Sequence, residues 1–255
     1  VETLEDLKEA TKQPYRVIGA GSNLLVSDEG VKERVVKLGQ TFNNLKNFKN
    51  QSDVWLGSST PLPGLIRRAQ QAGLSGLEGL LGVPAVLGGA IAMNAGTRYG
   101  EMSDTLQEVE VFVNGELERL SASALGLRYR HSEIPQGAII TRARLKLTPS
   151  TPEAVQAKLD QVDAARKGQP KQKSAGCAFK NPVGYSAGKL IDEAGLKGTR
   201  VGDAMVSLEH GNFIVNLGNA TAKDVLALLD LIRHRISIQY NDAVALETEW
   251  QLWGF

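Results

Sequence analysis

Residues 73–100 restrict the possible folds of this chain more than any other stretch, because glycine recurs throughout an apolar and almost uncharged segment. Flexible glycine-rich linkers are polar, so a linker is excluded here. Glycine lets the main chain approach another group closely, since it has no Cβ atom. Two interpretations remain: main chain packed against a large, flat ligand, or a helix–turn–helix segment whose backbones approach each other. We favour the ligand.

A second glycine cluster, residues 19–23, lies between predicted strands at 15–18 and 24–26. Successive backbone N–H groups with no Cβ in the way can form a nest for a phosphate. The pattern is not a Rossmann-type dinucleotide fingerprint, because the later glycine is missing and a strand follows the loop where a helix should. A phosphate-binding loop and an ordinary turn therefore both stay open.

The only cysteine, Cys177, lies in a basic loop at residues 169–182. Lys171, Lys173 and Lys180 surround it. Nearby lysines favour an anion and lower the pKa of a thiol, which indicates an active-site loop that holds a negatively charged substrate beside the thiol. A surface turn with a small buried cysteine is the alternative, because a free cysteine is often only a core filler.

Composition narrows the functional classes. A length of 255 residues predicts two modest domains. The formal net charge of +1 gives no case for nucleic-acid or membrane binding, and no apolar run approaches the ~20 residues of a membrane span. One cysteine excludes an internal disulfide and a cysteine-based metal centre, and the three histidines lack metal-ligand spacing. We therefore expect no bound metal. Because no signal-peptide pattern is present, we also expect a cytoplasmic protein.

Hydrophobic periodicity and turn residues predict the order of helices and strands. Helices are expected at 3–11, 60–72, 121–127, 152–167, 186–194 and from 221 onward, and strands at 15–18, 24–26, 35–36, 54–56, 138–147, 204–208, 213–216 and 244–253. Asn114-Gly115 predicts a tight hairpin turn between strands at 109–113 and 116–120. The proline-containing residues 148–152 are the best domain boundary.

Four segments, taken together and in order, resemble one family. They are Gly19-Ala20-Gly21-Ser22-Asn23-Leu24-Leu25-Val26, the stretch from Gly82-Val83-Pro84 through Gly88-Gly89-Ala90 to Asn94-Ala95-Gly96, Tyr129-Arg130-His131-Ser132, and Gly176-Cys177-Ala178-Phe179-Lys180-Asn181-Pro182. The ending Leu246-Glu247-Thr248-Glu249 fits as well. On these residues the chain resembles the UDP-N-acetylenolpyruvoylglucosamine reductases, FAD enzymes of peptidoglycan precursor synthesis. The resemblance covers nearly the whole chain and is to the shorter class of the family.

The resemblance implies an α+β fold. A two-part FAD-binding domain of the vanillyl-alcohol-oxidase type is expected at residues 1–150, with subdomains at about 1–54 and 55–150. A smaller C-terminal α+β substrate domain is expected at 151–255, and its last strand, about 244–253, could return to the FAD domain. The Thr-x-x-Val-Gly-Gly segment that precedes the first glycine loop in the family is absent, so the first strands of the flavin domain are expected to be missing and FAD retention to be affected.

The implied activity is the FAD-dependent reduction of UDP-N-acetylenolpyruvoylglucosamine to UDP-N-acetylmuramate, with NADPH as reductant. By similarity Arg130 and a protonated Glu249 stabilise the enediolate, and Cys177 protonates C2. An arginine has a permanent charge and a bidentate fork that suit a carboxylate, and a thiol with an ordinary pKa of about 8.5 has a proton to donate. Strand alternation alone does not choose between Glu247 and Glu249, which share a face; the family spacing does.

The resemblance also implies the binding residues and partners. Non-covalent FAD is expected on Gly19, Ala20, Gly21, Ser22, Asn23, Gly88, Gly89, Asn94, Ala95 and Gly96. The UDP-sugar is expected on Lys180, Lys167, Gln169 and Asn212. NADPH and the UDP-sugar are the expected partners of a monomer that binds neither nucleic acid nor membrane.

Two departures from the family pattern are visible. Cys177 stands where many members carry serine, and His131 stands where an aspartate is common. Two alternatives also stay open: another FAD-dependent oxidoreductase of the same fold, and a flavin-binding protein that has lost catalysis. The presence of Arg130, Cys177 and Glu249 together argues against lost catalysis.

Overall fold

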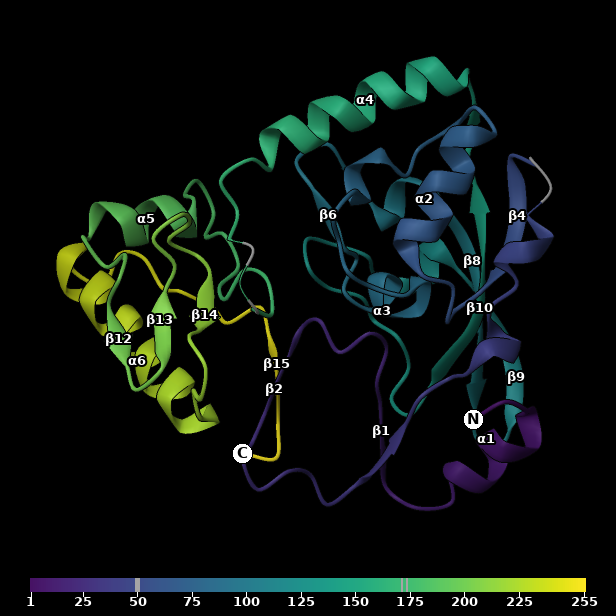
Figure 1. Ribbon diagram of the computed structural model, residues 1–255. Helices are drawn as coiled ribbons and strands as arrows, with labels where there is room; N and C mark the ends of the chain where they lie inside the picture. Colours follow the sequence, from purple (N-terminus) through teal and green to yellow (C-terminus); the bar gives the residue numbers. More distant parts are fainter. Residues whose placement is uncertain (49–50, 171, 173) are drawn as a thin grey trace. The chain divides into compact units, whose positions relative to one another are not determined.

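The structure is a computed structural model that describes residues 1–48, 51–170, 172 and 174–255. Its contacts divide the chain into two compact units. The first is Val1–Gly21 with Glu33–Arg166, and the second is Ser22–Lys32 with Lys167–Phe255. Each is described by itself (Figure 1). In the described part of the chain, no helix is long and apolar enough to cross a bilayer.

The boundary between the units differs from the predicted one at residue 150. The helix α4 (Pro152–Ala165) belongs to the first unit, because its residues Val155 and Leu159 are buried in that unit's core. Its start was predicted correctly: Thr151 caps it, and the Thr151 hydroxyl accepts the Ala154 N–H. The expected subdivision of the first unit near residue 54 stays a prediction.

The first unit contains most of the strands. Its elements are α1 (Leu4–Ala10), β1 (Tyr15–Val17), β3 (Arg34–Val36), η1 (Gln40–Phe42), η2 (Leu45–Asn47), β4 (Asp53–Gly57), α2 (Leu62–Gln71), β5 (Leu74–Ser75), η3 (Glu78–Leu80), α3 (Leu87–Ala92), β6 (Gly96–Thr97), β7 (Gly100–Glu101), η4 (Met102–Asp104), β8 (Leu106–Val113), β9 (Glu116–Ser121), η5 (Ala122–Leu125), β10 (Ile139–Lys146), β11 (Thr148–Pro149) and α4. The short helix expected at 121–127 forms as the 3-10 helix η5, and Gly126, with its left-handed backbone, ends it after Leu125.

The main sheet of the first unit is antiparallel, with the strand order β4-β10-β8-β9. Ala143 and Leu145 of β10 are fully buried, whereas Arg142 and Arg144 beside them are half-buried. This alternation gives the sheet one apolar face, which α2 and α3 cover (Figure 1). The arginines pair with carboxylates of neighbouring strands instead.

The hairpin β8–β9 forms as predicted. Asn114 and Gly115 both have a positive φ, 51° and 87°, as a two-residue turn of type I′ requires. The register is continuous from Val113↔Glu116 to Glu108↔Ser121.

The glycines of segment 73–100 serve two purposes. A Cβ on Gly79 would lie 2.6 Å from the Gly100 nitrogen, and one on Gly96 would lie 2.5 Å from the Glu101 Cβ. At these positions the glycines allow main chain to pack on main chain, which explains them without a ligand, and the cofactor role predicted for Gly96 stays a prediction. Gly88 and Gly89, on α3, line a cavity and are described with the site.

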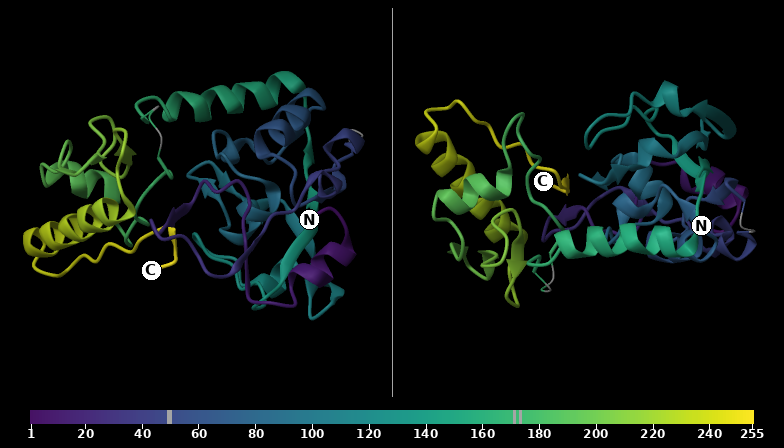
Figure 2. Two further views of the ribbon diagram at one scale, coloured as in Figure 1. Left: turned by 60° about the horizontal axis from the view of Figure 1, so that its bottom comes forward. Right: turned by 90° about the horizontal axis from the view of Figure 1, so that it is seen from above.

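The second unit is a small α+β unit. Its elements are β2 (Leu24–Val26), α5 (Ala187–Glu193), β12 (Arg200–Val201), β13 (Ala204–Val206), β14 (Ile214–Asn216), α6 (Ala222–Gln239) and β15 (Gln251–Trp253). Figure 2 shows α6, in yellow, along the green strands of the sheet β12-β13-β14. Residues 22–32 belong here because β2 pairs with β15 and the Asp28 carboxylate accepts the N–H groups of Ala222 and Lys223 at the start of α6.

The strand expected at 244–253 forms only at its end, as β15. Before β15 a single bridge, Phe179↔Thr248, pairs this stretch with the cysteine loop. A strand persists only where a partner continues its hydrogen-bond ladder, and here the ladder is interrupted. β15 pairs with β2, whose residues lie within the range 1–150 that was expected to form the FAD domain, although by its contacts β2 belongs to the second unit.

Candidate active site

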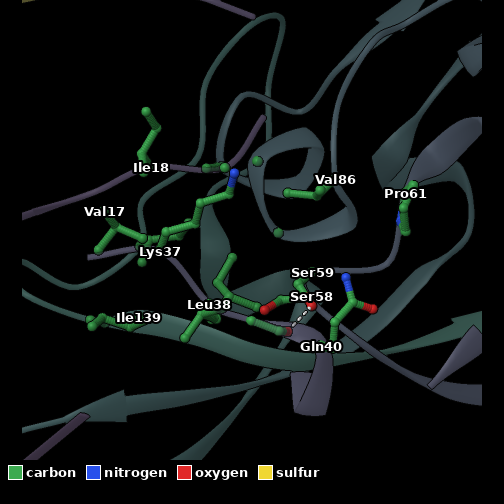
Figure 3. Close-up of a pocket in the computed structure, with 18 residues that line it drawn as sticks. Val17, Ile18, Lys37, Leu38, Gln40, Ser58, Ser59, Pro61, Val86 and Ile139 are labelled. Carbon is green, nitrogen blue, oxygen red and sulfur yellow. Dashed lines mark hydrogen bonds between the residues drawn. The ribbon is translucent and has the colours of Figure 1, made fainter. Parts of the chain in front are cut away.

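A cavity of about 330 Å³ lies in the first unit (Figure 3). Its walls are mostly apolar and come from Val17, Ile18, Gly19, Lys37, Leu38, Gly39, Gln40, Ser58, Ser59, Pro61, Val86, Gly88, Gly89, Ala92, Ile134, Ala138, Ile139 and Ile140. Figure 3 shows the Lys37 side chain extended and Ser58 beside Ser59. Pockets of this size and character hold small organic ligands or cofactors.

Two predicted cofactor segments meet at this cavity. A Cβ on Gly19 would lie 3.0 Å from the Val86 Cγ2 and 3.7 Å from the Gly89 Cα, so the loop packs closely on the start of α3. A Cβ on Gly89 would meet only Val86, at 3.9 Å. Main chain is therefore exposed to the cavity at Gly89, where a flat group could stack closely.

The loop at residues 19–23 offers donors to an anion. Among the described residues, the backbone N–H groups of residues 19–21 have no acceptor in the chain. Such successive N–H groups are available to an anion, which the predicted phosphate nest requires, and the nest itself stays a prediction. Of these residues only Gly19 lines the cavity itself.

The polar side chains that line the cavity, Lys37, Gln40, Ser58 and Ser59, were not predicted from the sequence. The Ser58 hydroxyl is buried and has no hydrogen-bond partner among the described residues, a state that a ligand would relieve. Ser59 donates its hydroxyl to the Gly39 carbonyl oxygen at 2.7 Å, and Lys37 brings a positive charge. The only signal in the sequence is that small polar residues follow the strand β4 directly and precede Pro61, which opens α2.

These features fit the FAD that the resemblance implies. Apolar walls suit an aromatic ring system, and the unpaired amides and Lys37 suit a phosphate. Neither cysteine nor histidine occurs among the described lining residues, which suits non-covalent binding. Across the described ranges, no group of three His, Cys, Asp or Glu side chains is placed to hold a metal ion.

Two of the predicted cofactor residues have other roles. Asn94 is 0% exposed and its amide bonds only protein groups: Nδ2 donates to the Arg128 carbonyl oxygen at 3.2 Å, and Oδ1 accepts the Ser103 N–H at 2.9 Å. Asn23 donates its amide to the Glu249 carbonyl oxygen at 3.1 Å in the second unit. Their contacts argue against flavin ligation by these two side chains. The other predicted residues outside the lining are Ala20, Gly21, Ser22, Ala95 and Gly96.

Arg130 lies in a tight turn of the first unit. Its φ is 53°, in the left-handed region that side chains other than glycine and asparagine rarely adopt. Its guanidinium donates from Nη2 to the Gly96 carbonyl oxygen at 2.6 Å and lies 5.0 Å from the centre of the Tyr129 ring. The cation is thus held in a defined orientation by its contacts with Gly96 and Tyr129.

Cys177 and Glu249 lie together in the second unit. Ala178 follows the cysteine, donates its N–H to the Asn212 carbonyl oxygen at 2.8 Å, and accepts the Glu249 N–H at 2.9 Å. The main chain of Cys177 forms an isolated antiparallel β-bridge with Phe213, and the residue is half-buried. One residue therefore fixes the main chain of both predicted catalytic side chains.

The predicted substrate-binding residues all belong to the second unit. Lys180 pairs with Glu247, with 2.7 Å between Nζ and Oε1. Lys167 is exposed and Gln169 is half-buried, beside the cysteine loop in sequence. Lys171 and Lys173 lie outside the described residues.

Asn212 is 3% exposed, and both ends of its side-chain amide bond the main chain of Phe179. Oδ1 accepts the Phe179 N–H at 2.9 Å, and Nδ2 donates to the Phe179 carbonyl oxygen at 2.8 Å. These contacts argue against the predicted role of Asn212 as a diphosphate ligand. They make it a support for the cysteine loop, because Phe179 is two residues from Cys177.

Comparison with known families gives matches in both units. Residues 2–121 match the family described as FAD binding domain, and residues 169–253 match the family described as UDP-N-acetylenolpyruvoylglucosamine reductase, C-terminal domain. The expected α+β fold, with an FAD-binding domain followed by a second domain, is confirmed.

Individual relatives agree. The chain is 57% identical to the UDP-N-acetylenolpyruvoylglucosamine reductase of Thermus thermophilus over 253 residues, which are 99% of this chain and 91% of the relative. It is 53% identical to the Deinococcus radiodurans protein of the same name over 262 residues, 99% and 88% of the two chains. The crystal structure of the corresponding reductase from Thermus caldophilus has a TM-score of 0.91 and 56% identity, over 99% of this chain and 90% of that one.

Proposed function

The chain belongs to the UDP-N-acetylenolpyruvoylglucosamine reductase family, and from that premise we propose that Arg130, Glu249 and Cys177 carry out the reduction of UDP-N-acetylenolpyruvoylglucosamine to UDP-N-acetylmuramate. The protein is an oxidoreductase of peptidoglycan synthesis that uses FAD and NADPH. We also propose that the protein is monomeric and cytoplasmic.

The cavity of the first unit is the proposed FAD site. Gly19 and Gly89 would lie against the cofactor, Ser58 would bond a polar atom of it, and Lys37 with the amides of residues 19–21 would hold its phosphates. Bound FAD supplies the hydride chemistry between NADPH and the enolpyruvyl group.

Arg130 and Glu249 stabilise the substrate when it accepts the hydride. Negative charge then develops on the carboxylate next to the reacting carbons, and fixed donors at such a point are usually the largest contribution to catalysis. Arg130 would provide a permanent cation whose orientation the Gly96 carbonyl already restricts. Glu249, in its protonated form, would donate to the same carboxylate.

Cys177 then gives a proton to C2. The observation that carries this assignment is the position of Ala178, whose N–H and carbonyl groups tie the cysteine loop to Asn212 on one side and to Glu249 on the other. A proton donor and a carboxyl group held by one residue can act on neighbouring atoms of one substrate. Lys167, Lys180 and Gln169 remain the proposed ligands of the nucleotide diphosphate.

An anaerobic half-reaction experiment tests this function. The flavin-loaded protein is first reduced with NADPH, which bleaches the flavin absorbance, and the enolpyruvyl nucleotide is then added. Reoxidation of the flavin by that nucleotide is expected. A protein that is reduced but not reoxidised would be a different FAD oxidoreductase, and one that is not reduced would be a flavin-binding protein without this catalysis.

Variants of Cys177 test the proton donor. Cys177→Ala should keep reduction by NADPH and slow the second half-reaction by about 10²- to 10⁴-fold, the usual contribution of a general acid. Cys177→Ser should stay partly active, because a hydroxyl still has a proton to give. Normal turnover of Cys177→Ala would place the acid elsewhere.

A further inference from the structure

Two short segments of the first unit are joined by three hydrogen bonds. The segment 92–96 begins at the end of α3, and the segment 128–132 forms the turn that carries Arg130. The Ala92 carbonyl oxygen accepts the Ser132 hydroxyl at 2.8 Å. The Asn94 amide donates to the Arg128 carbonyl oxygen at 3.2 Å, and the Gly96 carbonyl oxygen accepts Nη2 of Arg130 at 2.6 Å.

Asn94 is the central contact of the three. It is 0% exposed and has a φ of 40°, a left-handed conformation that asparagine tolerates better than most residues. Its Oδ1 accepts the Ser103 N–H at 2.9 Å, so the amide is fixed from its other side. The orientation of its Nδ2 towards the turn is therefore determined by two independent contacts.

The turn that Asn94 holds is itself strained. Arg128 and His131 close it by exchanging N–H···O bonds of 3.2 and 2.9 Å, so the Arg128 carbonyl oxygen serves both the turn and Asn94. Arg130 sits inside it with a φ of 53°. A non-glycine residue keeps such a backbone only where its surroundings over-determine it.

We propose that Asn94 is a positioning residue for Arg130: it holds the backbone of the 128–132 turn, while the Gly96 carbonyl holds the guanidinium, so that the fork meets the substrate carboxylate in one orientation. This inference rests on the proposed function and names the residue on which Arg130 depends. Asn94 lies two residues after the end of α3, whose last residue, Ala92, lines the cofactor cavity. The same segment thus connects the flavin site to the catalytic arginine.

The substitution Asn94→Asp tests the proposal. Aspartate has the same size, tolerates the left-handed backbone and still accepts the Ser103 N–H, but it opposes a carboxylate oxygen to the Arg128 carbonyl. The variant should retain its flavin and be reduced by NADPH at the wild-type rate. Its reoxidation by the enolpyruvyl nucleotide should fall about 10- to 100-fold, the cost of misplacing a catalytic group by about 1 Å.

Asn114→Asp is the matched control, because it makes the same chemical change at a left-handed residue in the exposed hairpin turn. It should behave as wild type in both half-reactions. The decisive comparison uses the background Arg130→Ala, in which Asn94→Asp should cause no further loss if it acts through the arginine.

Three results would overturn the proposal: an equal loss from Asn94→Asp with and without Arg130, a slower reduction by NADPH or loss of flavin, or wild-type rates throughout. Should Asn94→Asp not fold, Asn94→Gly is used, since glycine takes the backbone conformation without strain. If neither variant yields flavin-loaded protein, Asn94 is a folding determinant and the proposal fails. A wild-type enzyme that the nucleotide does not reoxidise rejects the proposed function itself, before any variant is compared.

Discussion

Arg130 and Cys177 are held in different ways, although a buried asparagine supports each. At Arg130, Asn94 holds the turn and the Gly96 carbonyl bonds the guanidinium directly. At Cys177, Asn212 holds Phe179, and the contacts at Ala178 fix the main chain on both sides. In the first case the side chain itself is oriented; in the second, the backbone carries it into place.

The difference follows from the length of the two side chains. An arginine loses about 2 kcal/mol of rotamer freedom when it is immobilised, so a direct bond to its guanidinium greatly reduces what remains to be ordered on substrate binding. A cysteine has one rotatable side-chain bond, so placing its Cα nearly places its sulfur. The comparison predicts that conservative replacement is costly at Arg130 and mild at Cys177.

The largest effect is expected at Arg130. Arg130→Ala should slow reoxidation of the reduced flavin by about 10²- to 10³-fold, as removal of one charge-stabilising donor usually does. Arg130→Lys should recover little, because lysine keeps the charge but not the fork that fits both Gly96 and a carboxylate. Rapid-mixing absorbance of each half-reaction measures both variants.

The control for Arg130 is its neighbour Arg128, whose exposed side chain pairs with Glu133 at 2.6 Å. Arg128→Ala should leave both half-reactions near the wild-type rate, because a surface ion pair contributes little. Equal losses from Arg128→Ala and Arg130→Ala would remove the distinction between the two arginines. Full activity of Arg130→Lys would show that the orientation of the side chain is unimportant.

The support of the cysteine loop should appear as stability. Asn212→Ala leaves the N–H and carbonyl groups of Phe179 buried without these partners, since Phe179 is 1% exposed. The free energy of unfolding should fall by about 2–3 kcal/mol, measured by denaturant titration. The exposed Asn219→Ala should change it by less than about 0.5 kcal/mol. A loss of activity without a loss of stability would instead make Asn212 a substrate ligand.

The smallest expected effect is a change in the stability of the protein with pH, caused by His210. Burial, followed by the charge of Lys197, lowers the pKa of His210 below its ordinary value of 6.5, with Asp192 acting in the opposite direction. The neutral ring accepts the Asn212 N–H on Nδ1 at 3.1 Å. Because the unfolded chain takes up this proton more readily, His210 contributes stability above about pH 6.5 that is lost as the pH falls through the folded-state pKa.

Melting temperatures from about pH 7.5 to about pH 5 test this linkage. His210→Gln keeps an acceptor for Asn212 but cannot gain a proton, so wild type should lose more stability on acidification than the variant does. Parallel curves of melting temperature against pH for the two proteins would show that His210 does not contribute to the loss of stability in acid.

Local chemistry made several features readable from the sequence. Asn114-Gly115 requires a hairpin of one type, Thr151 with Pro152 requires a helix start, and both form as predicted. The order of four motifs was enough to indicate the family, which the comparisons show. Each of these inferences depends on neighbours in the chain, where residue type alone limits the conformations.

Other features depended on partners distant in the sequence. Asn94 and Asn212 lie in motifs that pointed to ligands, yet their amides are used up on Arg128, Ser103 and Phe179. Nothing in residue type tells which acceptor a buried amide will meet. Ser58, in contrast, is not distinguishable in the sequence, because only burial separates its unpaired hydroxyl from that of an ordinary surface serine.

The sequence by itself determined the family and the α+β class, and it singled out the glycine loop and the cysteine loop as the candidate sites, since those inferences depend on residue types in a fixed order. The tertiary structure decided which glycines face the cavity and which face other main chain, and where the boundary between the compact units falls. It also decided which side chains support Arg130 and Cys177. The physical reason is that a hydrogen bond or a close backbone approach is a property of two segments, and only folding brings the second segment to the first.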